Sequence, residues 1–189
     1  KKAFEYAFSV SKSDKIVVER MLKGQEYYAF YAMAEGEPAL IALHTMCHQP
    51  NYPYNCYSFL TSDTKELEHF LRELNEKLMQ VLKAVGCREG VAWFEFILDE
   101  DNHFYILEMG YRMNGELTFL CYEDVCGFDV IKWLTDISLG VKHKKSDLPK
   151  SQTKAYEKSA NVFACWTKEA GKVVRIDGLD ELAHLPNVH

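Results

Sequence analysis

Residues 91–109 read Val91-Ala92-Trp93-Phe94-Glu95-Phe96-Ile97-Leu98-Asp99-Glu100-Asp101-Asn102-His103-Phe104-Tyr105-Ile106-Leu107-Glu108-Met109. Two apolar runs flank a short acidic stretch, and this pattern is typical of a β-hairpin with a polar turn. Each run carries one carboxylate, Glu95 inside the first and Glu108 near the end of the second. We therefore expect this hairpin to organise both the sheet and the functional site.

The hairpin also predicts that its two carboxylates lie close together. If the turn is centred on the acidic residues, the numbers of paired residues add up to about 201–203, which places Glu95 opposite residues 106–108. Two acids side by side on a sheet repel each other and lose hydration, so a cation or a shared proton must compensate. Mg²⁺ suits such a site because it binds one or two carboxylates together with phosphate oxygens. On spacing alone an alternative stays open, in which one glutamate faces solvent or pairs with Arg88 or Arg112.

The other periodic segments predict an α+β fold with a mainly antiparallel sheet and flanking helices. Strands are expected over 16–22, 26–35, 39–43, 160–166 and 172–176. Helices are expected near the start of the chain, over 63–85, over 128–139 and, as a short turn, over 179–185. Asp63 and Glu66 are spaced as a capping box for the long helix, and Gly86 is placed to end it.

Two stretches lack any period. Residues 46–60 are rich in Pro, Asn, Tyr and Cys and predict a loop long enough to be functional. Residues 141–158 are polar and rich in Lys and Ser, and they predict an exposed connector. We divide the chain into residues 1–140 and residues 141–189, and we expect the connector and C-terminal hairpin of the second part to pack on the same domain.

Composition narrows the class of protein. The 189 residues are 48% hydrophobic, which is sufficient for one buried core. The 22 Lys and Arg against 28 Asp and Glu give a net charge of −6, which disfavours nucleic-acid binding because that function needs a basic face. The six cysteines are scattered, no apolar run is long enough to span a membrane, and the N-terminal residues do not resemble a signal peptide. These features predict a cytoplasmic protein without a membrane partner.

A second group of polar residues lies between Val17 and Glu26. Here an apolar run ends, Gly24 permits a turn, and Glu19 and Glu26 flank an edge whose backbone groups could contact a flat heterocycle. An ordinary strand, turn and strand with solvent-exposed glutamates explains the same pattern.

The combined order of these residues resembles that of a known superfamily. Glu19-x-x-x-x-Gly24-x-Glu26, then a long helix, then Glu95-x₁₂-Glu108-x-x-x-Arg112 is similar to the C-terminal part of the ATP-grasp domain, in particular that of carbamoyl-phosphate-synthase-like and biotin-carboxylase-like ligases. The closing stretch from Gly171 to Pro186 also resembles the tail of those ligases. No single motif is diagnostic, but the resemblance covers nearly the whole chain.

The resemblance implies a nucleotide site. Glu19 and the backbone near Met21 and Leu22 would contact adenine, and Glu26 would bind the ribose hydroxyls. ATP is the cofactor that this arrangement implies.

The same resemblance implies a metal site and a reaction. Glu95 and Glu108 would hold one or two Mg²⁺, or Mn²⁺ in their place, at the ATP phosphates, and Arg112 would lie beside the transferred phosphoryl group. Such ligases activate a carboxylate as an acyl phosphate, which an amine or another nucleophile then attacks. Small carboxylates and amines are therefore the implied partners, and a homodimer is compatible with this class.

The sequence departs from the family pattern at one ligand. Many members have Asn two residues after the second glutamate as a further metal ligand, whereas this chain has Gly110. Asn114 in the following loop could supply the missing ligand. Alternatively, one metal is lost and Asn114 is a plain turn residue.

The other departure lies upstream. In the family, a flexible Gly-rich loop and lysines that grip the triphosphate come earlier in the domain than the part that this chain resembles, and the chain opens at Lys1 inside an amphipathic pattern. We expect a fragment that needs a missing N-terminal part of a parent enzyme and is inactive alone. The alternative from another class is a non-catalytic, ATP-grasp-like binding or regulatory module.

The stretch after residue 43 offers two lesser candidates. His44, Cys47 and His48 could suggest a zinc site, although spacing places no fourth ligand. Contact of His48 or Gln49 with substrate is the better interpretation under the resemblance. Three tyrosines of the same stretch either line a substrate pocket or pack over the core edge; they are Tyr52, Tyr54 and Tyr57.

Overall fold

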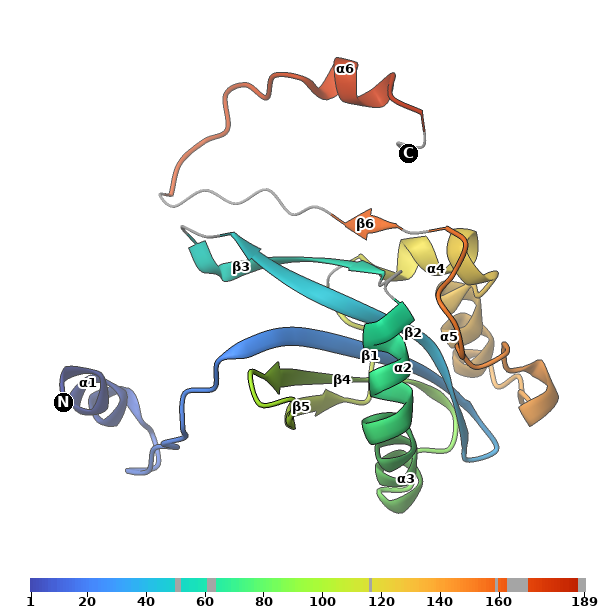
Figure 1. The fold of residues 1–189 in the computed structure, drawn as a ribbon, viewed down its shortest axis with the longest axis horizontal. Helices are drawn as coiled ribbons and strands as arrows, with labels where there is room; N and C mark the ends of the chain where they lie inside the picture. Colours follow the sequence, from blue (N-terminus) through green and yellow to red (C-terminus); the bar gives the residue numbers. More distant parts are fainter. Residues whose placement is uncertain (50–51, 61–63, 116, 159, 163–169, 187–189) are drawn as a thin grey trace.

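The computed structural model describes residues 1–49, 52–60, 64–115, 117–158, 160–162 and 170–186, with the backbone alone for residues 49 and 52–60. Its centre is an antiparallel sheet of six strands in the order β5-β4-β1-β2-β3-β6 (Figure 1). The strands are β1 (Gly24–Ala34), β2 (Glu37–Gln49), β3 (Tyr52–Leu60), β4 (Gly90–Asp99), β5 (Phe104–Gly110) and β6 (Asn161–Val162). With its flanking helices, this sheet confirms the predicted α+β class.

One face of the sheet is covered by the long predicted helix. It runs as α2 (Thr64–Phe70), a π-helical turn over Leu71–Asn75 and α3 (Glu76–Ala84), and Gly86 follows it with a φ of 82°. Its apolar stripe packs on alternate residues of β1 and β4, and the rings of Phe70 and Phe96 stack at 5.3 Å. The helix prediction is confirmed, whereas its proposed cap Asp63 lies outside the described residues.

The opposite face is covered by α4 (Phe119–Cys126) and α5 (Val130–Ser138). The spacing over 128–139 predicted α5, but no expected element corresponds to α4. Phe30 of β1 stacks on Tyr122 of α4 at 4.8 Å, and both rings are fully buried. Further along the same face Glu26 and Glu95 are only half-buried, so the helices leave this end of the sheet accessible.

The predicted strand over 16–22 is wrong. Residues 11–23 form an extended linker whose side chains are almost all exposed, and it joins α1 (Lys2–Val10) to β1. An apolar run becomes a strand only when it finds a hydrogen-bonding partner. Both edges of β1 are already taken, by β2 and β4, so the linker has no place beside it.

The predicted loop over 46–60 is also wrong. β2 continues to Gln49, and β3 pairs with it antiparallel from His44 opposite Leu60 to Gln49 opposite Tyr52. Pro and Asn in this stretch favour a loop locally, but pairing with a long neighbouring strand outweighs that preference. The sheet therefore contains a longer β2 and an additional strand, β3, that the sequence did not predict.

The C-terminal part forms less regular structure than predicted. Residues 161–162 pair with β3 as β6, residues 163–169 lie outside the described part, and residues 172–176 form no strand. The helical turn is confirmed as α6 (Leu179–Ala183). The division of the chain at residue 140 remains a prediction.

The connector over 141–158 is not exposed throughout, which corrects the prediction. It contains a 3₁₀ turn (Lys145–Asp147) and then packs along β2. Gln152 is 3% exposed, donates its backbone N–H to Leu40 and accepts the N–H of Leu43 at 2.9 Å. The connector therefore satisfies backbone groups of the sheet, which composition alone could not indicate.

Within the described part of the chain, no helix combines the length and the apolar character that crossing a membrane would require.

Candidate functional site

The hairpin places its two carboxylates directly opposite each other. β4 and β5 pair Glu95 with Glu108 and Trp93 with Gly110, as the predicted turn requires. The turn is held by Asp99, whose Oδ1 accepts the N–H groups of Asp101 and His103 at 3.0 and 2.8 Å. A bulge after Glu95 shifts the register by one residue toward the turn without disturbing the glutamate pair.

These glutamates lie on the wall of a cavity of about 180 Å³ on the face that also carries α4 and α5. The cavity is lined by Tyr28, Met46, Trp93, Glu95, Glu108, Arg112, Asn114 and Gly115. All four polar residues predicted for the metal and the phosphoryl group are therefore brought together, although the sequence separates them by up to 19 positions. Of the predicted alternative, the ion pair of either glutamate with Arg88 or Arg112 does not form among the described residues. Its other form holds in part, because Glu108 is exposed to solvent at the edge strand β5 while Glu95 is half-buried.

Glu95 is the carboxylate with the most perturbed environment. Burial and a hydrogen bond with Glu26, and then repulsion by the Glu26 charge, raise the pKa of Glu95 to about 8, while nearby His48 acts in the opposite direction. His48 Nε2 lies 2.5 Å from Glu26 Oε2. A carboxyl group kept protonated near neutral pH is held ready to exchange its proton for a cation.

An aromatic wall supports the cavity. The rings of Tyr28 and Trp93 stack at 5.5 Å, and the guanidinium carbon of Arg112 lies 5.2 Å from the Trp93 ring centre. This cation–π contact holds the exposed Arg112 side chain beside the cavity. Sequence reasoning missed Trp93, although its position two residues before Glu95 places it on the same face of the strand.

Asn114 is buried at the cavity and offers an acceptor. Its side chain is 6% exposed, and its Nδ2 donates to the hydroxyl of Thr118 at 2.8 Å. Across the described residues no donor reaches its Oδ1. Buried acceptors of this kind are uncommon and indicate a missing partner, such as water or an ion.

Gly110 cannot carry a side chain in this structure. A Cβ atom built on it would lie 2.3 Å from Cε2 and 2.6 Å from Nε1 of Trp93, far inside any tolerated contact. The sequence has Gly at position 110, where many family members have Asn, and the Trp93 indole occupies the space that a side chain at this position would need.

The residues predicted to contact adenine lie apart from the cavity. Glu19 and Met21 are exposed and Leu22 is partly buried, all in the linker before β1, and none of them lines the cavity. The linker contacts the hairpin through Arg20, whose guanidinium carbon lies 5.2 Å from the Tyr105 ring centre. Glu26, predicted at the ribose, is in contact with Glu95 and His48, and its ribose contact remains a prediction.

The zinc interpretation of the stretch after residue 43 receives no support. His44 Nε2 is hydrogen-bonded to the Tyr122 hydroxyl at 2.8 Å inside the core. Among the described residues, three His, Cys, Asp or Glu ligand atoms come within 4.8 Å of one another only at Asp99, Asp101 and His103, in the hairpin turn. The side chains of Gln49 and of the three tyrosines lie outside what the structure describes.

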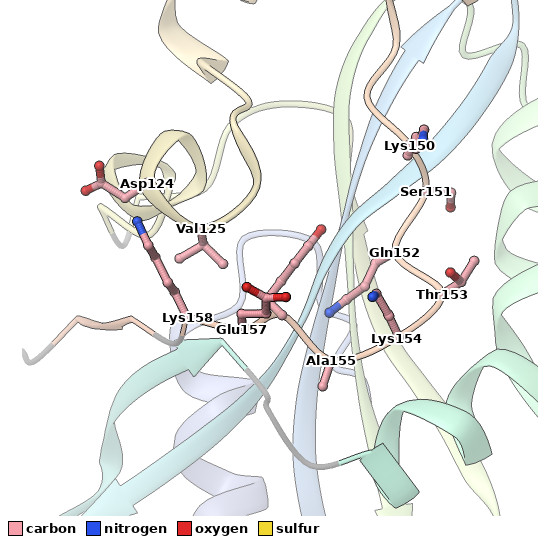
Figure 2. A pocket seen from close by; sticks show the side chains of 11 residues that line it. Asp124, Val125, Lys150, Ser151, Gln152, Thr153, Lys154, Ala155, Glu157 and Lys158 are labelled. Carbon is pink, nitrogen blue, oxygen red and sulfur yellow. The ribbon is translucent and has the colours of Figure 1, made fainter.

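A larger cavity, of about 390 Å³, lies between the end of α4 and residues 150–158 (Figure 2). Its walls carry Asp124 and Glu157 together with several lysines. These charges are mixed in sign and exposed, and no two carboxylates are paired there. The smaller cavity is the better functional site because it combines paired carboxylates, a buried acceptor and an arginine.

Comparison with solved structures shows a shared fold at low sequence identity. Biotin carboxylase from Campylobacter jejuni, solved as a β,γ-ATP complex, has a TM-score of 0.61 at 21% identity, over 79% of this chain and 33% of that protein. The L-amino acid ligase from Bacillus licheniformis has a TM-score of 0.57 at 18% identity, over 68% and 32%.

A third structure, the biotin carboxylase domain dimer of the Hydrogenobacter thermophilus 2-oxoglutarate carboxylase, was solved with MgADP, ADP and bicarbonate. It has a TM-score of 0.58 at 18% identity, over 79% and 33%. The chain thus spans about a third of the length of these proteins.

The search of the curated proteins finds no match to this sequence. Residues 1–119 match the family profile described as the ATP-grasp domain, and this match covers more than half of the chain. The chain belongs to the ATP-grasp domain family, as its sequence resemblance predicted.

Proposed function

We propose that the protein containing this chain is an ATP- and Mg²⁺-dependent ligase that activates a carboxylate as an acyl phosphate for attack by an amine or another nucleophile. The observation that carries the proposal is the pairing of Glu95 with Glu108 on the wall of one cavity that also contains Arg112 and Asn114. Family membership supports it, since the similar solved structures include an amino acid ligase and biotin carboxylases.

The residues present fit a hard divalent cation. Glu95, Glu108 and Asn114 offer only oxygen donors, which suit Mg²⁺ or Mn²⁺ better than softer metals. The buried Oδ1 of Asn114 has no donor within the described structure, and we propose this oxygen as the third ligand atom. A cation bound there would neutralise charge on the ATP phosphates during phosphoryl transfer.

The chain's own side chains contribute position and charge. Arg112, held against Trp93, would neutralise the oxygens of the transferred phosphoryl group. In the proposed reaction a substrate carboxylate oxygen attacks the γ-phosphorus, the bond to the bridging oxygen breaks and ADP leaves. The nucleophile then attacks the acyl carbon, phosphate leaves, and the attacking amine loses its proton.

The nucleotide base is proposed to lie at the linker and the start of β1. Glu19 and the backbone of Met21 and Leu22 would contact adenine, and Glu26 would contact ribose. The exposure of Glu19 and Met21 leaves them accessible to a ligand. Other parts of the protein would complete the site, because this chain spans about a third of the similar structures.

The substrates and the oligomeric state are also proposed from the family resemblance and the similar structures. A small carboxylate and an amine are the proposed substrates, in the manner of carbamoyl phosphate synthase. A homodimer is proposed because one similar biotin carboxylase domain was solved as a dimer. The cytoplasmic setting remains a prediction from composition.

The direct test is Glu108→Gln in the full-length protein. This change keeps the size of the side chain and removes the charge, so Mg²⁺-dependent ADP release in the presence of substrate should fall by at least about 100-fold. Glu100→Gln, in the exposed hairpin turn, is the matched control and should retain activity. Turnover by Glu108→Gln equal to that of the control would rule out the metal assignment.

A second function, a non-catalytic nucleotide-binding or regulatory module, is favoured by one observation. Trp93 fills the space above Gly110, so the ligand that many family members have at this position is absent. Calorimetry of the full-length protein with Mg²⁺ and ATP, combined with an assay of ADP release in the presence of substrate, distinguishes the two functions. Nucleotide binding with ADP release supports the ligase, and nucleotide binding without ADP release supports the module. Absence of nucleotide binding contradicts both.

A further inference from the structure

We propose that Trp93 determines which side chain supplies the amide ligand of this site, and that the ligand is Asn114. The inference rests on the proposed function, because it requires a cation at Glu95 and Glu108. It adds a specific residue that decides the ligand set. It also explains why position 110 carries no side chain.

The first step is steric. Trp93 is directly paired with Gly110 across β4 and β5, and its indole lies over the glycine backbone. The Cβ of any other residue at position 110 would lie 2.3–2.6 Å from three atoms of this ring. The ring cannot easily move, because it is 5% exposed and stacks on Tyr28 at 5.5 Å. A ligand side chain at position 110 is therefore incompatible with an indole at position 93.

The second step is the path of the chain after β5. The strand ends at Gly110, and the following turn brings Asn114 back to the cavity that Glu95 and Glu108 line. Asn114 is fixed there by its hydrogen bond to Thr118 at 2.8 Å. The loop thus returns an amide to a site from which the strand position is blocked.

The third step is the state of the amide oxygen. The Thr118 hydroxyl takes the Nδ2 side of Asn114, which leaves Oδ1 buried without a donor in the described part of the chain. A buried unpaired acceptor destabilises a fold unless a partner supplies the missing interaction. Beside two carboxylates, a divalent cation is the partner of matching charge.

The test transfers the ligand from one position to the other. Mn²⁺ binding is measured by calorimetry for Asn114→Ala in two backgrounds, wild type and the double variant Trp93→Val with Gly110→Asn. In the wild type, Asn114→Ala should weaken Mn²⁺ binding by at least about tenfold. In the double variant it should weaken binding by less than about twofold, since Asn at position 110 then has room to bind the ion.

Two results would overturn the inference while leaving the proposed function intact. Asn114→Ala could have no effect in the wild type, or it could have the same effect in both backgrounds. If the wild type binds no Mn²⁺, or if Glu95→Gln leaves Mn²⁺ binding unchanged, the proposed function itself fails.

A melting experiment tests the steric step without any metal. Gly110→Asn alone should lower the melting temperature by several degrees, on the order expected for overpacking a core. The same change in a Trp93→Val background should lower it far less, and Trp93→Leu offers a larger replacement if Val unfolds the protein. Equal losses in the wild-type and the substituted backgrounds would show that the indole does not hold this space.

Discussion

Glu95→Gln makes the sharpest prediction about stability. Folding raises the pKa of this carboxyl from 4.5 to about 8, first by burial and then through Glu26. Between these pH values the unfolded chain has lost the proton while the folded protein keeps it. The stability that this proton contributes is therefore fully present below pH 4.5 and is lost as the pH rises to about 8.

The size of the expected stability loss follows from the same pKa shift. A pKa change from 4.5 to about 8 corresponds to at most about 5 kcal/mol in the free energy of unfolding. The side chain is only half-buried, so solvent screening reduces the expected loss to about 1–2 kcal/mol. Gln has nearly the same shape, does not ionise, and can still donate a hydrogen bond to Glu26, so the variant should not show this loss.

The assay is urea unfolding, monitored by circular dichroism, at about pH 5 and about pH 8.5, which bracket most of the pH range over which Glu95 titrates. From the lower to the higher pH, the free energy of unfolding of the wild type should fall by about 1–2 kcal/mol more than that of Glu95→Gln. Glu100→Gln, in the exposed turn, should behave like wild type. Mg²⁺ should restore stability to the wild type at the higher pH but not to Glu95→Gln. Equal pH dependence in wild type and Glu95→Gln would refute the proposed environment of Glu95.

Two further substitutions test contacts that fix the sheet. Tyr31→Phe removes the hydrogen bond that the fully buried Tyr31 donates to Asn75 at 2.8 Å, so the free energy of unfolding should fall by about 1 kcal/mol, and an unchanged urea midpoint would contradict this. Gln152→Leu leaves the buried N–H of Leu43 without its acceptor, and we expect a loss of about 1–3 kcal/mol by the same measurement. Stability equal to that of wild type would show that the connector is dispensable for β2.

The carboxylate pair was predictable because its determinants are local. A polar turn between two apolar runs fixes which residues face each other, and the structure pairs Glu95 with Glu108 accordingly. The long helix was predictable for the same reason, since its period and the glycine at its end lie within one segment. Neither prediction needed information from a distant part of the chain.

The strand predictions were wrong where strand formation depends on pairing with a neighbouring strand. Residues 16–22 are apolar enough for a strand but find both edges of β1 occupied, whereas β3 forms despite its proline because β2 offers a long free edge. Strand formation depends on a partner that the segment itself does not contain. The buried part of the connector was missed for the same reason, because its partner is the distant strand β2.

By itself the sequence determined the hairpin, the helix behind it, the acidic residues of the site and the family resemblance. Only the tertiary structure decided that Glu26 contacts Glu95, that Trp93 covers Gly110 and that Asn114, with a buried oxygen that lacks a donor among the described residues, lines the same cavity as Glu95. These relations depend on distances between side chains that come from three different segments. Local periodicity fixes the face on which a residue lies, whereas packing fixes which atoms occupy the space between those faces.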